Sequence, residues 1–125
     1  MKAGKFDPVY GGGEHADTSE ETVHELIVSM GLGNAVTIKG VFPEETGNRV
    51  RGALAFVHCD VDVYQSAKDM VEWAMPRLTR GGVLVFDDYG FKNCQGVTTL
   101  VNELRRDSCF LFFHNLNGHA ILVRR

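Results

Sequence analysis

The sequence has few cysteines, and their number and spacing argue against two common ways of stabilising a small fold. Cys59, Cys94 and Cys109 are an odd number, and no two of them form a CxxC pair. A disulfide framework uses an even number of cysteines and a thiolate zinc site uses closely spaced pairs, so the sequence suggests neither. We therefore expect a protein of the reducing cytoplasm.

Long apolar runs and an excess of basic charge are also absent. The longest apolar stretches, residues 109–113 and 120–123, are far shorter than the roughly 20 residues that a membrane helix needs. Residues 1–5 are not followed by the apolar stretch of a secretory signal. Thirteen basic and sixteen acidic residues give a net charge of −3, which provides no cationic surface for nucleic acid or an anionic membrane. Basic partners or metal ions fit this charge better, and we expect a small-molecule substrate rather than nucleic acid or a membrane.

Length and hydrophobic periodicity predict one α/β domain. A chain of 125 residues with 44% hydrophobic content can bury one modest core, with residues 1–17 as an N-terminal loop around the Gly11-Gly12-Gly13 run. Helices that alternate with short apolar strands indicate a mostly parallel sheet, and Asn117-Gly118 indicates a C-terminal antiparallel hairpin. We expect a first helix that begins at a Thr18/Glu21 capping box, followed by strands at residues 36–39 and 53–59, the second of which is covered on both faces. The next helix begins at Ser66, carries Leu78 and ends at Gly81-Gly82. A strand at 83–86, a helix over about 97–104, and strands at 109–113 and 120–123 complete the predicted elements.

Two of the predicted strands end in acidic residues. Asp60 and Asp62 follow one strand, and Asp87 and Asp88 follow the next. Ligands in open parallel sheets bind at the carboxyl ends of the strands, and gathered carboxylates repel one another unless a cation compensates them. An all-oxygen ligand set favours Mg²⁺, Mn²⁺ or Ca²⁺ over zinc. From spacing alone the alternative stays open that these aspartates only form turns and helix caps.

A longer series of motifs resembles one enzyme family. The segments are Asp60-Val61-Asp62-Val63-Tyr64-Gln65-Ser66, Pro76-Arg77-Leu78, Gly81-Gly82, and Asp87-Asp88-Tyr89-Gly90, and Lys39-Gly40-Val41-Phe42-Pro43-Glu44-Glu45-Thr46 looks like a G-x-F-x-x-T segment. In this order they closely resemble the macrocin O-methyltransferase family of antibiotic-tailoring enzymes. The resemblance implies a Rossmann-like fold that uses S-adenosylmethionine and Mg²⁺.

Carried over position by position, the resemblance implies roles for six residues. Asp60, Asp87 and Asp88 would be the magnesium ligands, and Asp62 the general base. Gly40 and Phe42 would lie near the adenine of S-adenosylmethionine. Methyl transfer to a hydroxyl needs an aligned and deprotonated oxygen, and a bound cation beside a carboxylate can provide both.

The sequence departs from this family at its N-terminal side. The family's glycine-rich cofactor loop and ribose-binding acid have no counterpart, because no strand precedes Gly11-Gly12-Gly13 and no helix starts directly after it. The chain therefore resembles the C-terminal part of the fold, a truncated domain that begins after the second strand. Loss of the first strands would expose a sheet edge, which predicts a homodimer or larger assembly through residues 54–58 or 36–39; the competing outcome is that these two segments pair within one chain.

Other reactive side chains are interpreted as structural. His15, His24, His58, His114 and His119 lack the spacing of a zinc site, and Cys59, Trp73 and the Phe110, Phe112 and Phe113 group are expected to pack in the core or on the sheet.

Two functions are thus left open. The first is an O-methyltransferase, or part of one, that acts on a hydroxyl of a sugar or other small metabolite. The second is a non-catalytic, methyltransferase-like module that binds a metal and self-associates.

Overall fold

The computed structural model describes Asp7 and residues 17–125. The predicted N-terminal loop, with the exception of Asp7 and Asp17, and His15 lie outside the described residues. The described elements are, in order, α1 (Glu20–Ser29), a short 3-10 helix (Gly47–Arg49), β1 (Leu54–Cys59), α2 (Tyr64–Ala74), β2 (Leu78–Phe86), α3 (Gln95–Leu104), β3 (Phe110–His114) and β4 (Ala120–Arg124).

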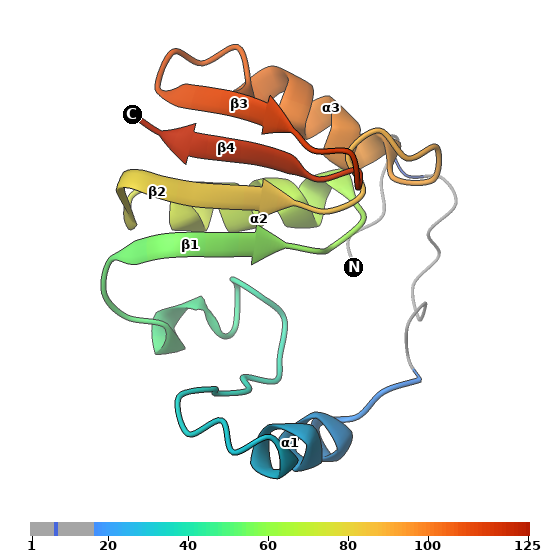
Figure 1. Ribbon diagram of the computed structural model, residues 1–125, viewed down its shortest axis with the longest axis vertical. Helices are drawn as coiled ribbons and strands as arrows, with labels where there is room; N and C mark the ends of the chain where they lie inside the picture. The colour runs from blue at the N-terminus through green and yellow to red at the C-terminus, as the bar shows by residue number, and fades with distance from the viewer. Residues whose placement is uncertain (1–6, 8–16) are drawn as a thin grey trace.

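The four strands form one mixed sheet in the order β1-β2-β4-β3. β1 and β2 are parallel, and β4 is antiparallel to both of its neighbours, so three strands run in one direction (Figure 1). The predicted α/β fold with a C-terminal antiparallel hairpin is confirmed. The hairpin inserts β4 next to β2, which puts β3 rather than β4 at the sheet edge.

The core lies between the sheet and two helices. Figure 1 shows α2 and α3 side by side on the same face of the sheet. Their apolar sides cover a row of paired residues that runs across the strands, in which Leu84 and Leu122 are fully buried. Phe86 and Ala120 form the next row and are fully buried as well. Alternation along each strand places these residues on one face of the sheet.

The opposite face of the sheet is largely open. Two rows of residues that lie opposite one another on neighbouring strands belong to this face. One row consists of Phe56, Val83, Val123 and Leu111, and the other consists of His58, Val85, Ile121 and Phe113. Phe56 is 61% exposed and Phe113 is 54% exposed. The prediction that the strand at residues 53–59 is covered on both faces is therefore wrong for the described residues. Phe113, which was expected to pack in the core or on the sheet with Phe110, lies outside the core that buries Phe110.

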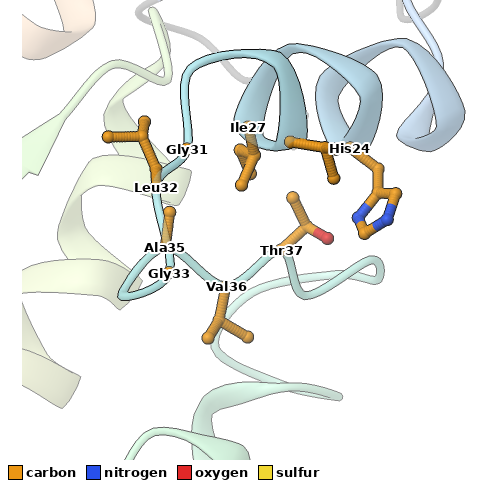
Figure 2. Close-up of a pocket in the computed structure, with 9 residues that line it drawn as sticks. His24, Ile27, Gly31, Leu32, Gly33, Ala35, Val36 and Thr37 are labelled. Carbon is orange, nitrogen blue, oxygen red and sulfur yellow. The ribbon is translucent and has the colours of Figure 1, made fainter.

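Helix α1 lies apart from the sheet and buries no residue. Its N-cap is Ser19 rather than the predicted Thr18, since the Ser19 hydroxyl accepts a hydrogen bond from the Thr22 backbone N–H at 3.1 Å. The helix and the segment after it line an apolar pocket of about 460 Å³, with Ile27, Leu32 and Val36 among its walls (Figure 2).

No strand forms at residues 36–39, so that prediction is wrong. Val36 is 81% exposed, and this segment makes no ladder with β1. A strand is stable only when its backbone N–H and C=O groups find partners. Because β1 pairs with β2 alone among the described strands, the alternative in which residues 36–39 close against residues 54–58 within one chain is also wrong for that part of the chain.

The boundary between α2 and β2 also differs from the prediction. α2 begins at Tyr64, before Ser66, and its N-cap is Val63. Leu78 belongs to β2, because the Leu54 backbone N–H bonds to the Arg77 carbonyl at 2.8 Å and so pairs the chain before the glycines. The register then shifts from Leu54 opposite Leu78 to Phe56 opposite Val83, and Gly81 takes a φ of 76° within this bulge.

Within the described residues, every helix is too short or too polar to cross a bilayer.

Candidate metal and cofactor site at the strand ends

Three carboxylates converge where β1 and β2 end. Asp60 directly follows β1 and Asp87 directly follows β2, and the Asp87 backbone N–H bonds to the Cys59 carbonyl at 3.0 Å. This bond continues the parallel ladder and holds the two strand ends in register. Asp60, Asp87 and Asp88 each offer a carboxylate oxygen that lies within 4.8 Å of the others. The three residues predicted as metal ligands are thus neighbours in space.

The backbone turns sharply after each strand. Asp62 has a φ of 58° and Asp88 a φ of 56°, and these are the described non-glycine residues with positive φ. Asp62 stands three residues beyond the end of β1, and Asp88 stands two residues beyond the end of β2. Aspartate tolerates this left-handed region better than most residues, but at a cost in backbone energy.

Asp62 lies beside the three carboxylates rather than within their group. It groups with Asp88 and Cys94, whose ligand atoms also lie within 4.8 Å of one another. The Cys94 thiol approaches the Asp62 carboxylate, with an Sγ to Oδ1 distance of 3.9 Å. Asp88 therefore belongs to both groups and connects the predicted general base to the predicted metal ligands.

The charge of the cluster has little basic compensation. His119 Nε2 lies 2.8 Å from Asp87 Oδ1. Over Asp7 and residues 17–125, no lysine or arginine forms an ion pair with Asp60, Asp87 or Asp88. Gathered carboxylates without a lysine or arginine partner are a chemical setting that favours a bound cation. Asp60 is exposed and Asp87 and Asp88 are half-buried, and such accessible oxygen donors suit Mg²⁺ or Mn²⁺.

The predicted cofactor residues line the same cavity as one of the predicted metal ligands. Gly40 and Phe42 form a cavity of about 570 Å³ together with Asp60 and Ser66. This volume is in the range of small-molecule sites. The structure therefore brings the carboxylate cluster and the 40–44 segment to one place.

Trp73 holds that segment in place, a role that was not predicted from the sequence. Its ring packs edge-on against Phe42, with 4.8 Å between ring centroids. Its indole Nε1–H donates to the Gly47 carbonyl at 3.2 Å. Trp73 is half-buried beside the core, so it tethers the cavity wall to α2 as well as packing there.

Cys59 is a packing residue, as expected. Its side chain is buried at the end of β1, and burial, with the neighbouring Asp60 and Asp62 charges, raises the pKa of the thiol to about 12. A thiol that stays protonated at neutral pH is a poor nucleophile.

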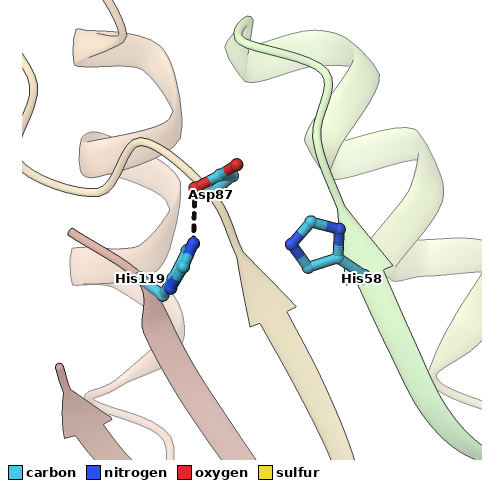
Figure 3. A group of neighbouring side chains, drawn as sticks. All are labelled: His58, Asp87 and His119. Carbon is cyan, nitrogen blue, oxygen red and sulfur yellow. Dashed lines mark ion pairs between the residues drawn. The ribbon is translucent and has the colours of Figure 1, made fainter. Parts of the chain in front are cut away.

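Two histidines that the sequence did not point to also lie at this edge. His58, Asp87 and His119 come from three neighbouring strands, and their ligand atoms lie within 4.8 Å of one another (Figure 3). His58 shares a face of β1 with Asp60, which is two residues on. His119 lies in the β3–β4 hairpin, directly before β4. Its position next to Asp87 depends on the pairing of β2 with β4, which the spacing of residues along the sequence does not reveal.

Comparisons with known proteins identify what this arrangement is similar to. The model of the family described as Macrocin-O-methyltransferase (TylF) matches residues 13–109. A curated relative from Streptomyces olivaceus, 8-demethyl-8-(2,3-dimethoxy-alpha-L-rhamnosyl)-tetracenomycin-C 4'-O-methyltransferase, is 36% identical over 58 residues, which are 46% of this chain and 22% of that protein.

Solved structures show the same fold. The O-methyltransferase NovP matches with a TM-score of 0.74 at 23% identity, over 86% of this chain and 45% of NovP. The O-methyltransferase from Bacillus cereus in complex with SAH matches with a TM-score of 0.58 at 16% identity, over 86% of this chain and 60% of that one. These matches confirm a partial Rossmann-like methyltransferase fold. The chain spans less than two thirds of the length of each of these proteins.

Proposed function

The chain belongs to the macrocin O-methyltransferase family, and from this premise we propose that it is, or forms part of, an O-methyltransferase that uses S-adenosylmethionine and Mg²⁺. Its acceptor would be a hydroxyl of a sugar or other small metabolite. The curated relative's printed name includes a rhamnosyl acceptor, which supports a sugar. The observation that carries the proposal is the convergence of Asp60, Asp87 and Asp88 beside the cavity lined by Gly40 and Phe42.

The donor set fits the cation that the family implies. Asp60, Asp87 and Asp88 would hold it through carboxylate oxygens, the ligand type that Mg²⁺ prefers. The Gly40 and Phe42 cavity is large enough for part of S-adenosylmethionine. When bound, S-adenosylmethionine supplies a methyl group on a sulfonium sulfur, and the cation supplies positive charge that lowers the pKa of a nearby hydroxyl.

The chain's own residues would orient the acceptor and remove its proton. The hydroxyl oxygen forms a bond to the methyl carbon while the sulfur–carbon bond breaks, so the hydroxyl proton must leave. Asp62 would accept this proton, and its position beside Asp88, outside the three-carboxylate group, supports that role.

The metal part of the proposal is tested by thermal melting with Mg²⁺ or Mn²⁺. We expect the cation to raise the melting temperature of the wild type, and the Asp60→Asn/Asp88→Asn variant to lose that shift. The matched control is Asp17→Asn/Glu72→Gln, which removes two exposed carboxylates away from the strand ends. An unchanged metal-induced shift in the Asp60/Asp88 variant would show that the cation binds elsewhere.

The second candidate function is a non-catalytic module that binds a metal and self-associates. The open face of the sheet and the edge of β1, which pairs with no other strand than β2 within Asp7 and residues 17–125, favour it. Isothermal titration with S-adenosylmethionine separates the two functions. Saturable binding that Phe42→Ala weakens would support the methyltransferase, whereas absence of binding would exclude catalysis by this chain alone.

A further inference from the structure

The contact between His119 and Asp87 is one end of a longer hydrogen-bonded arrangement. His119 Nε2 lies 2.8 Å from Asp87 Oδ1, and Figure 3 marks this pair with a dashed line. The other ring nitrogen of His119, Nδ1, lies 2.8 Å from Nδ2 of Asn115. Asn115 and His119 face each other across the base of the β3–β4 hairpin, where the Asn115 backbone N–H bonds to the His119 carbonyl at 3.0 Å.

The hydrogen bonds of Asn115 determine which nitrogen of His119 carries the proton. Asn115 Oδ1 accepts from the backbone N–H of Asn117 at 3.0 Å and from that of His119 at 2.8 Å. An oxygen that accepts two N–H groups fixes the orientation of the amide, so the Nδ2 group must donate toward the imidazole. His119 Nδ1 is then the acceptor, and the ring proton is on Nε2, directed at Asp87.

This tautomer leaves one oxygen of Asp87 for another ligand. Asp87 Oδ1 accepts from His119 Nε2–H and also from the Asp88 backbone N–H at 3.1 Å. Both hydrogen bonds fall on the same oxygen, so Oδ2 is the oxygen left to a cation. We propose that Asn115 and His119 are positioning residues that hold Asp87 ready to bind the cation; this rests on the metal site of the proposed function.

Direct binding of a metal by the histidines fits the hydrogen bonds less well. His58, Asp87 and His119 have ligand atoms close enough to form such a site. A metal on His119 Nε2 would require the proton to move to Nδ1, where it would point at the Asn115 amide, which is itself a donor. Metal-binding histidines usually donate their other N–H to a carboxylate or carbonyl instead.

Manganese binding to the full chain, followed by the electron paramagnetic resonance signal of free Mn²⁺, tests the proposal. We expect His119→Ala to weaken binding by about 10-fold, the lower end for removing a group that orients a metal ligand. His119→Gln should recover most of the affinity, because the glutamine amide can place an N–H near the position of Nε2. His24→Ala, which removes a histidine exposed on α1, is the matched control and should bind as the wild type does.

Two outcomes would overturn the positioning role. Wild-type affinity in His119→Ala, together with lost affinity in Asp60→Asn/Asp88→Asn, would reject it and leave the proposed metal site intact. Equal loss of binding in His58→Ala and His119→Gln would instead identify the histidines as direct ligands.

The tautomer provides a readout that does not depend on metal. A two-bond ¹H–¹⁵N correlation spectrum of the metal-free protein should show the His119 ring protonated at Nε2 and unprotonated at Nδ1. The Asn115→Ala variant should show a weaker preference for this tautomer. A proton on Nδ1 in the wild type would reject the inference whatever the metal does. The expected tautomer in a chain that binds no Mn²⁺ would reject the proposed metal site and the positioning role with it.

Discussion

Asp62 and Asp88 combine a costly backbone conformation with a place beside the carboxylate cluster. Each holds a positive φ within three residues of the end of a parallel strand. Glycine would adopt this conformation without strain, yet the chain has a carboxylate at both positions. Strain that persists at a site is consistent with a use for the side chain there. We therefore treat both carboxylates as functional candidates.

Asp62→Asn tests the role of Asp62 in proton transfer. Asparagine also tolerates positive φ, so the variant should fold with a melting temperature near that of the wild type. With S-adenosylmethionine and a rhamnosylated acceptor, turnover should fall by about 10²–10⁴-fold, the usual contribution of a general base. Asp107→Asn, an exposed carboxylate on another loop, is the control. Full activity of Asp62→Asn would reject the assignment.

Cys59 predicts how stability depends on alkaline pH. Burial raises its pKa from 9.0 to about 12, so the neutral thiol is favoured in the folded chain. Its contribution to the free energy of unfolding is complete below about pH 9 and is lost as the pH rises from about 9 toward about 12. Urea unfolding at pH 8 and pH 10.5 should therefore show a steeper loss for the wild type than for Cys59→Ala, by about 2 kcal/mol.

Cys109→Ala is the matched control for this measurement. Cys109 is only half-buried, and its pKa is raised chiefly by a smaller degree of burial and by Asp107. The free energy of unfolding of Cys109→Ala should therefore fall between pH 8 and pH 10.5 by nearly as much as that of the wild type. Equal slopes for all three proteins would show that Cys59 ionises freely in the folded state.

Helices α2 and α3 share one capping group that is distant in sequence. Neither N-cap residue, Val63 or Cys94, makes a side-chain capping bond. Instead Asp7, which is 1% exposed, accepts from the Tyr64 backbone N–H at 2.8 Å and from the Gly96 backbone N–H at 2.9 Å. A carboxylate at two helix N-termini satisfies orphan donors and interacts favourably with both helix dipoles.

Asp7→Ala and Gly96→Ala should both destabilise the fold through this contact. The first removes the acceptor, and the second adds a Cβ that would overlap the Asp7 carboxylate. We expect each to lower the free energy of unfolding by about 1–3 kcal/mol, and the double variant to lose less than the sum because both changes remove the same bonds. Gly33→Ala, with open space around it, is the control. Additive losses in urea unfolding would contradict the shared cap.

The sequence predicted elements whose signals are local. The helix around Leu100, the strand at residues 53–59 and the hairpin about Asn117-Gly118 all follow from periodicity and turn residues, and the structure contains them. The start of α2 could not be predicted from local sequence, because the backbone N–H of Tyr64 donates to the distant Asp7 carboxylate and Ser66 is not the cap. The segment 36–39 has strand-like residues but lacks a partner strand.

The candidate site was predictable to the same extent. Asp60, Asp87 and Asp88 could be brought together because they end two strands joined by a single helix, and their motif spacing is distinctive. His119 and Asn115 were not predictable as neighbours of Asp87. Their place depends on the antiparallel register of β2 and β4, which sets Ala120 opposite Phe86.

At the scale of the whole molecule, the described chain leaves two apolar surfaces uncovered. The open face of the sheet presents Phe56, Leu111 and Phe113, and α1 presents Leu26 and Val28 to solvent. Contiguous exposed apolar surface usually marks an interface. Among the described strands, the sheet also ends at β1, which pairs with β2 alone. A free strand edge next to an apolar face can pair with another chain.

We propose that β1 pairs with a second copy of this chain in a homodimer or larger assembly. Leu54–Cys59 has no lysine or proline to oppose such pairing, and Phe56 stands on its exposed side. Light scattering at concentrations of about 100 μM, well above the dissociation constant of a micromolar interface, should detect the assembly. Phe56→Lys should shift it to monomer without loss of folding, since the side chain is already 61% exposed. Leu116→Lys makes the same change at a fully exposed hairpin position and should leave the assembly intact. A monodisperse wild-type monomer, or equal effects of the two lysines, would reject pairing through β1.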